Sequence, residues 1–165
     1  MNNYILITAA RNEEAFIEKT IKSVIAQTIL PLEWVIVSDG STDKTDEIVE
    51  SYCAKFEFIK LRRRSGEKIR SFGSKAKAVM FAYNTLENLD FEYIGNLDAD
   101  ISFDSTYYEN ILNKFEQDEN LGVAGGIRFD FCDETFRRLP CASNSVGGPF
   151  QMFRKSCFEQ VGGYS

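Results

Sequence analysis

The chain has 165 residues, of which 44% are hydrophobic and 27% charged, proportions typical of a globular domain rather than a disordered or fibrous chain. A formal charge of −6 disfavours nucleic acid binding over the whole surface. No apolar run reaches the length of a membrane span, and the N-terminus lacks the features of a signal peptide. The absence of histidine excludes a Ser-His or Cys-His catalytic pair in this chain. The four scattered cysteines favour reduced, cytoplasmic thiols over a zinc site or a disulfide framework.

Strands and helices are expected to alternate in the first part of the chain, because short apolar runs are followed by apolar residues at helical spacing. In chain order these elements are a strand at Tyr4–Ala10, a helix capped by Asn12 and continuing through Gln27, a strand at Trp34–Ser38, a helix capped by Thr42 or Asp43, and a strand at Phe56–Leu61. Residues 62–73 are polar and punctuated by glycine, so an exposed loop is expected there.

The same alternation continues in the second part of the chain. The expected elements are a helix at Lys75–Leu86, a strand at Phe91–Leu97, a helix around Tyr107–Phe115, a strand at Leu121–Phe129, a long irregular stretch, a strand at Phe150–Phe153, and a short helix at Lys155–Val161 closed by Gly162. This order predicts an α/β fold, a three-layer sandwich whose mostly parallel central sheet carries helices on both faces. In such sheets ligands bind beyond the carboxyl ends of the strands.

Two carboxylates follow the fourth expected strand directly, in the segment Asp98-Ala99-Asp100. Residues two apart in an extended segment project to the same side, so both side chains can face one site. Two carboxylates held close together repel unless a cation lies between them. A hard divalent ion with oxygen ligands, Mg²⁺ or Mn²⁺, is the natural occupant. The alternative is that Asp98 and Asp100 are solvated turn residues.

Polar residues also follow the second strand and open the third helix. Asp39 begins the segment Asp39-Gly40-Ser41-Thr42-Asp43 and could accept a hydrogen bond from a nucleobase or a ribose, or the segment could simply turn and cap a helix. Lys75 and Lys77, with Arg70, could contact phosphate or ribose oxygens, or they could be solvated surface charges. The same two interpretations apply to Arg62-Arg63-Arg64, whose functional version is a patch attracted to phosphate or to a membrane surface.

The order and spacing of these motifs carry a family resemblance. The segments YILITAARNEE, WVIVSDGSTDKT, GSKAKAVMFAYN, YIGNLDADIS and GGPFQMFRKSCFEQVGGYS, taken together, resemble the family 2 glycosyltransferases of the GT-A fold. The resemblance runs from Tyr4 to the last residue, and DGSTD and DAD are its most specific parts. It implies a Rossmann-like nucleotide-binding domain over 1–165, with the nucleotide-sugar half at 1–103 and the start of the acceptor half at 104–165.

The resemblance also implies an activity. The enzyme would transfer a sugar from a nucleotide-diphospho-sugar, with UDP favoured, to a saccharide or lipid-linked acceptor, with inversion and with Mn²⁺ or Mg²⁺ as cofactor. This activity belongs to polysaccharide biosynthesis. The expected location is the cytoplasm, with the full-length enzyme associated peripherally with the inner face of the membrane.

Individual roles follow from the same resemblance. The backbone at Ala9 and Ala10, with Glu14 nearby, matches the base-binding first loop of the family, and Asp39 matches the aspartate that accepts from the base. Lys77, and less surely Lys75, matches the region that reaches the nucleotide. The remaining matches are Asp98 on the ribose or metal side, Ala99 beside the nucleotide sugar, and Asp100 as the direct metal ligand. Gly147-Gly148 would allow backbone close to the sugar, or form an ordinary turn.

Three departures from the family pattern are visible. Ala9 stands where the family often has proline, and Arg11 stands where it often has an aromatic residue. The acidic general base of the family follows the Gly162-Gly163-Tyr164 segment, so it is expected beyond Ser165; Glu159 is a poor substitute because it is expected on a helix. The chain is therefore expected to be the N-terminal portion of a longer enzyme, binding a nucleotide with a divalent ion but transferring sugar slowly or not at all.

Three other functions are compatible with parts of the sequence. A haloacid-dehalogenase-type phosphatase would use Asp98 as nucleophile and Asp100 as general acid, with Lys114 or Lys155 as its lysine, but no strand-terminal acidic pair follows. A dinucleotide oxidoreductase lacks its GxGxxG after the first strand. A non-catalytic module that binds a sugar nucleotide also fits the missing base.

Overall fold

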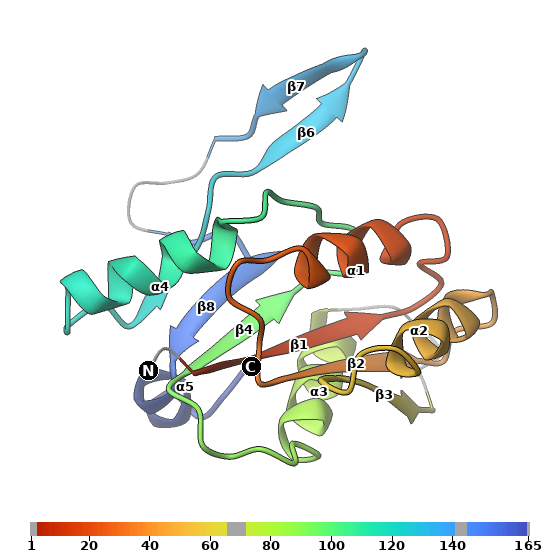
Figure 1. Ribbon diagram of the computed structural model, residues 1–165, viewed down its shortest axis with the longest axis horizontal. Coiled ribbons are helices and arrows are strands. Elements are labelled where there is room, and N and C mark those ends of the chain that lie inside the picture. Colours follow the sequence, from red (N-terminus) through yellow and green to blue (C-terminus); the bar gives the residue numbers. More distant parts are fainter. Residues whose placement is uncertain (1–2, 66–71, 141–144, 165) are drawn as a thin grey trace.

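The computed structural model describes residues 3–65, 72–140 and 145–164. Its main sheet has the strand order β3-β2-β1-β4-β8-β5 (Figure 1). The first four strands run parallel, whereas β8 is antiparallel to both β4 and β5. The strands are β1 (Tyr4–Ala10), β2 (Glu33–Asp39), β3 (Ile59–Arg64), β4 (Tyr93–Leu97), β5 (Val123–Ala124) and β8 (Phe150–Arg154). The predicted mostly parallel sheet is confirmed.

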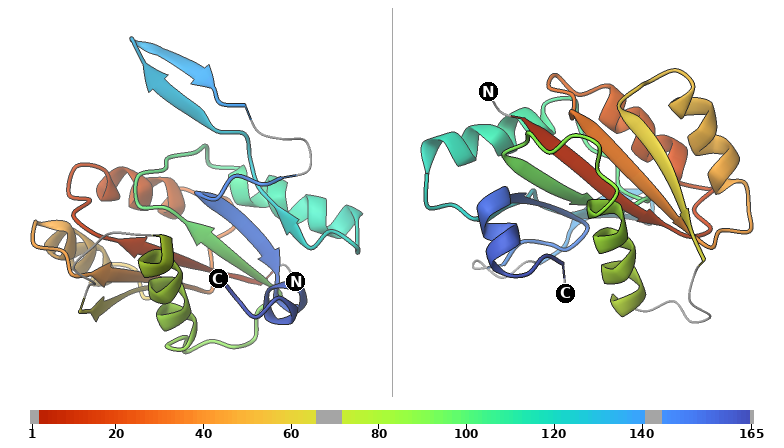
Figure 2. Two further views of the ribbon diagram at one scale, coloured as in Figure 1. Left: turned by 180° about the vertical axis from the view of Figure 1, so that it is seen from behind. Right: turned by 90° about the horizontal axis from the view of Figure 1, so that it is seen from below.

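Helices cover both faces of this sheet, which confirms the predicted three-layer arrangement. One face carries α1 (Ile17–Ile25), α2 (Thr45–Cys53) and α4 (Tyr107–Gln117), and the other carries α3 (Phe72–Tyr83) and α5 (Lys155–Gln160) (Figure 2). Among the described residues, no helix combines the length and apolarity that a bilayer crossing requires.

Side chains on the two faces of the central strands pack into two separate hydrophobic clusters. Leu6 and Ile36 pack in the cluster under α1, α2 and α4, whereas Ile7 and Val37 pack in the cluster under α3 and α5. Because both faces are covered, these strands read in sequence as continuous apolar runs rather than as alternating ones. The buried Trp34 keeps its indole N–H paired, donating to the Thr8 hydroxyl at 3.0 Å.

The first helix begins later than expected. Asn12 does not cap it: its φ is 56° and α1 begins at Ile17. Asn12 instead makes a left-handed turn after β1, and its side-chain oxygen accepts from the backbone N–H of Thr42 at 2.8 Å. Asparagine is among the few residues that tolerate this conformation. The prediction failed because one asparagine suits both a cap and a left-handed turn.

The third strand is displaced towards the C-terminus. It runs from Ile59 to Arg64, so Arg62, Arg63 and Arg64 belong to a strand and not to the expected loop. β3 forms one end of the sheet, and its basic side chains are paired with acids of α2 and of the segment after α3. Charged residues of this kind are common on edge strands, where they discourage pairing with other chains.

The region after α4 departs most from the prediction. The strand expected at Leu121–Phe129 is wrong over most of its length, because pairing with β8 is limited to Val123 and Ala124. The expected irregular stretch contains a hairpin of β6 (Phe129–Cys132) and β7 (Thr135–Arg138). Its turn residues Asp133 and Glu134 have positive φ without the glycine that normally signals such a turn.

Candidate functional site

A cavity of about 380 Å³ opens at the carboxyl ends of β1, β2 and β4. These ends meet because β1 lies between β2 and β4 in the sheet. Three separate sequence motifs therefore reach one site. Seven of the candidate site residues from the sequence line it, namely Ala9, Ala10, Asp39, Lys75, Asp98, Ala99 and Asp100.

Two other candidates from the sequence, Glu14 and Lys77, do not line the cavity. Glu13 lines the cavity and Glu14 does not, and Lys75 lines it whereas Lys77 is exposed elsewhere on α3. Arg11 and Ser74 complete the lining. Arg70 lies outside the described residues, so its part in the site remains a prediction.

The loop after β1 is joined to the loop after β2 by side-chain hydrogen bonds. The Glu13 backbone N–H donates to the Thr45 hydroxyl at 2.8 Å, and that of Glu14 donates to an Asp43 carboxylate oxygen at 3.1 Å. Glu14 in turn accepts from the Lys44 backbone N–H at 3.0 Å. Glu14 thus braces the two loops, and this bracing holds the neighbouring Glu13 at the cavity.

Asp39 is held from two sides in a nearly closed environment. Its carboxylate accepts from Nη1 of Arg64 at 2.8 Å and from the Ser74 hydroxyl at 2.7 Å, and its side chain is only 7% exposed. The pairing with Arg64 follows from strand register, since Asp39 and Arg64 are direct neighbours on β2 and β3. A carboxylate has about four lone-pair sites, so each oxygen keeps capacity for a ligand.

Asp98 forms an ion pair with Lys75 at the mouth of the cavity. The Lys75 ammonium also lies 5.9 Å from the ring centroid of Tyr164, which follows α5. Burial raises the pKa of the Tyr164 hydroxyl, and the nearby Asp98 charge raises it further. The Lys75 ammonium therefore compensates the charge of Asp98 at the cavity. Ammonium groups also pair with phosphate oxygens.

The Asp98–Asp100 segment is fixed by its backbone rather than by strand geometry. β4 ends at Leu97, so the three residues lie in a turn and not in the extended segment that the sequence suggested. The Asp98 N–H donates to the Pro149 carbonyl at 2.8 Å, and the Thr20 hydroxyl donates to the Ala99 carbonyl at 2.7 Å. Asp100 is left exposed at the cavity.

The Gly147-Gly148 segment lies beside the same turn. The Asn96 side-chain amide donates to the Gly148 carbonyl at 2.8 Å, which ties this segment to the end of β4. A Cβ added at Gly148 would meet no atom within 4 Å. Open space therefore surrounds Gly148, although neither glycine lines the cavity.

Two of the three cavity aspartates, Asp98 and Asp100, match one mode of metal binding. Within 3–65, 72–140 and 145–164, no group of three or more His, Cys, Asp or Glu side chains gathers to form an all-protein metal cage. Mg²⁺ is usually held by one or two carboxylates together with substrate phosphates and water. Asp98 and Asp100 could supply two carboxylates of such a donor set.

The two lysines considered for the phosphatase alternative, and the substitute base Glu159, lie away from the cavity. Lys155 donates to the Leu89 carbonyl at 2.9 Å, and Lys114 lies in the last turn of α4. Glu159 accepts from the Tyr83 hydroxyl at 2.9 Å. None of the three lines the cavity.

Comparison with known proteins assigns the chain to a family. The family described as Glycosyl transferase family 2 matches residues 5–162. Poly-β-1,6-N-acetyl-D-glucosamine synthase of Staphylococcus epidermidis is 25% identical over 177 aligned residues, covering 94% of this chain and 40% of that protein. The synthase of the same name from Staphylococcus aureus is 27% identical over 179 residues, with the same coverage. The chain therefore spans less than half the length of these relatives.

Solved structures share the fold. A mannosyltransferase of Pyrobaculum calidifontis, in complex with GDP-Man and Mn²⁺, superposes with a TM-score of 0.74 at 18% identity, covering 98% of this chain and 47% of that one. S. aureus TarS in complex with UDP gives a TM-score of 0.71 at 20% identity, covering 96% and 48%. At these identities the likeness shows a shared fold.

Proposed function

The chain belongs to glycosyl transferase family 2, and from that premise we propose that it binds a UDP-sugar together with a divalent cation and transfers the sugar to a saccharide acceptor with inversion. N-acetylglucosamine is the sugar we propose. Two lines support this choice: relatives that share 94% of this chain include poly-β-1,6-N-acetyl-D-glucosamine synthases, and TarS has been solved with UDP-GlcNAc.

The observation that carries the proposal is the convergence of the strand-end motifs on one cavity. Asp39 is far in sequence from Asp98 and Asp100, yet all three line the cavity, together with Ala9 and Ala10. The cavity volume of about 380 Å³ falls within the range of small-molecule sites.

Each cavity residue has a role in this proposal. Asp39, oriented by Arg64 and Ser74, accepts from an N–H of the base. The first turn of α3 carries Ser74 and Lys75, so the N-terminal end of the helix dipole and one ammonium group face the phosphates. Lys75 moves from Asp98 to a phosphate oxygen when the nucleotide binds.

The reaction needs negative charge on the departing diphosphate to be stabilised. A bound divalent ion supplies this stabilisation, and Asp98 and Asp100 would hold it. The protein orients the sugar so that the acceptor hydroxyl attacks the anomeric carbon opposite the leaving diphosphate, which inverts the configuration. We assign no general base within residues 1–165. Glu159 is already engaged by Tyr83.

Calorimetry tests the binding half of this proposal. UDP, GDP and UDP-N-acetylglucosamine are titrated with and without Mn²⁺ into the wild-type protein and the Asp100→Asn variant. Asp90→Asn is the matched control, because Asp90 is an exposed aspartate before the opposite end of β4. UDP should bind more tightly with Mn²⁺, and Asp100→Asn should remove that gain, about tenfold or more, while Asp90→Asn preserves it. Equal gain in all three proteins excludes Asp100 as a ligand.

A further inference from the structure

The β6–β7 hairpin lies at the same edge of the sheet as the cavity. β4 and β5 are both antiparallel to β8, so they run parallel to each other and end at the same edge. The hairpin is inserted between β5 and β8, and therefore leaves the sheet at the edge where Asp98 and Asp100 lie. Figure 1 and Figure 2 show it projecting from the main body.

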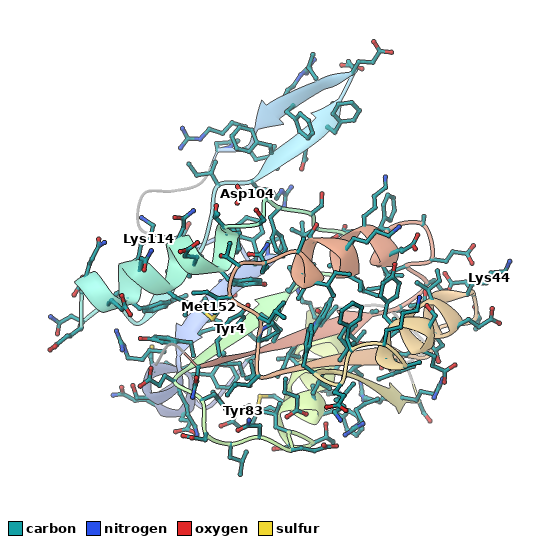
Figure 3. All side chains as sticks on the ribbon, in the orientation of Figure 1. Tyr4, Lys44, Tyr83, Asp104, Lys114 and Met152 are labelled. Atoms are coloured by element: carbon teal, nitrogen blue, oxygen red, sulfur yellow. The ribbon has the colours of Figure 1, made fainter. Side chains whose placement is uncertain are left out.

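One face of this hairpin is apolar. Phe131 lies opposite Phe136, and Phe129 lies opposite Arg138, and directly opposed residues share a face of a two-stranded sheet. We call the surface made by these four residues the phenylalanine face. Its three phenylalanines are 52%, 64% and 73% exposed in chain order. Figure 3 shows ring side chains on the hairpin that stand clear of the body of the protein.

The exposed area is unusual for a surface in water but small for a protein interface. A phenylalanine buries roughly 200 Å², so the three rings expose on the order of 400 Å². Apolar patches of this size on a monomer are often functional. A stable protein dimer buries about 800 Å² per partner, which the phenylalanine face cannot supply. An isolated two-stranded hairpin is also marginally stable in water, so contact with an apolar phase would stabilise it.

The charges of the hairpin are sorted between its two faces. Asp130 and Arg137 lie on the face opposite the rings, where Asp130 pairs with Arg128 at 3.2 Å and Arg137 pairs with Asp133 at 3.0 Å. Arg138 is the charged member of the phenylalanine face, and no acidic partner for it occurs in the described parts of the chain. Aromatic rings beside an unpaired guanidinium match the boundary between acyl chains and phosphate headgroups.

We propose that the phenylalanine face docks on a phospholipid membrane, with the rings in the interfacial layer and Arg138 against lipid phosphate. Because the chain carries a formal charge of −6, the rings and not general electrostatics drive this contact. Binding is therefore expected to survive high salt, which would abolish a purely ionic attachment. Docking also brings the edge of the cavity to the membrane, where a lipid-linked acceptor would meet it; only this consequence rests on the proposed function.

Flotation with vesicles of phosphatidylcholine and phosphatidylglycerol tests the docking. The proteins are the wild type, the double variant Phe131→Ser/Phe136→Ser, and the matched control Asp130→Ser/Arg137→Ser, which changes the opposite face of the same strands. We expect the wild type and the control to float with vesicles at low and high salt. The phenylalanine variant should lose about tenfold in vesicle affinity and keep its affinity for UDP.

Each other outcome decides against the docking or against the proposed function. If the wild type does not float, or if high salt releases it completely, the phenylalanine face is not a membrane anchor. A wild-type dimer in sedimentation, converted to a monomer by Phe131→Ser/Phe136→Ser and without vesicle binding, assigns the surface to a second copy of the chain instead. Vesicle binding without any UDP binding would overturn the proposed function and leave the docking intact.

Discussion

Replacement of Asp39 by alanine should destabilise the protein strongly, because it breaks a largely buried ion pair. The side chains of Asp39 and Arg64 are 7% and 19% exposed, and their contact is 2.8 Å. Removing one partner of a buried pair costs 3–5 kcal/mol, and the Ser74 hydroxyl also loses its acceptor. Since Arg64 retains some solvent, we expect the low end, about 3 kcal/mol of unfolding free energy.

Urea denaturation measures this loss of free energy. The midpoint temperature of thermal unfolding should fall by about 6–12 °C in a chain of this size. Asp130→Ala is the control, since it removes an Asp–Arg pair of similar geometry whose side chains are 45% and 42% exposed; about 0–0.5 kcal/mol is expected. Equal losses in the two variants would refute the buried pairing. Asp39→Asn keeps the shape of the side chain and tests base recognition apart from stability. We expect this variant to lose about tenfold in affinity for UDP.

Three further predictions concern other parts of the structure. Lys75→Met should weaken UDP binding about threefold to tenfold but strengthen Mn²⁺ binding without nucleotide, because it removes the cation that competes at Asp98; calorimetry showing both affinities unchanged contradicts this role. Burial raises the pKa of Tyr107 to about 12, so in the unfolded chain this group ionises first, near its ordinary pKa of about 10. Its contribution to stability is therefore complete below pH 10 and is lost between about pH 10 and 12, and urea unfolding of Tyr107→Phe should show a shallower decline over that window than the wild type. Glu134 has a φ of 62°, so Glu134→Gly should stabilise the hairpin by about 0.5–1 kcal/mol; amide exchange in β6 and β7 should slow, and faster exchange would exclude strain at this turn.

Much of the architecture was predictable because strands buried on both faces appear in the sequence as continuous apolar runs. The continuous apolar runs at β1, β2 and β4 were located within one or two residues, and the helices between them required parallel pairing. This parallel pairing predicts that Asp39, Asp98 and Asp100 lie at the same edge of the sheet. Strands at the edges of the sheet have a weaker sequence pattern, since β3 is rich in arginine and β5 has only two residues.

The details of the site were less predictable because they depend on local conformation. The left-handed turn at Asn12 shifts the loop after β1, so that Glu13 faces the cavity and Glu14 faces Lys44. Arg64 was assigned to a loop, although extending β3 to its end would have placed it opposite Asp39. Tyr164 reaches Lys75 only through the turn made by Gly162 and Gly163, both with positive φ.

The most direct test is a crystal of the protein grown with UDP and Mn²⁺, in which anomalous scattering locates the manganese. The account predicts one strong peak bonded to carboxylate oxygens of Asp98 or Asp100 and to the diphosphate, with the uracil at Asp39 and the Lys75 ammonium turned to a phosphate. Manganese bonded to neither aspartate, or UDP bound outside the cavity, would contradict it.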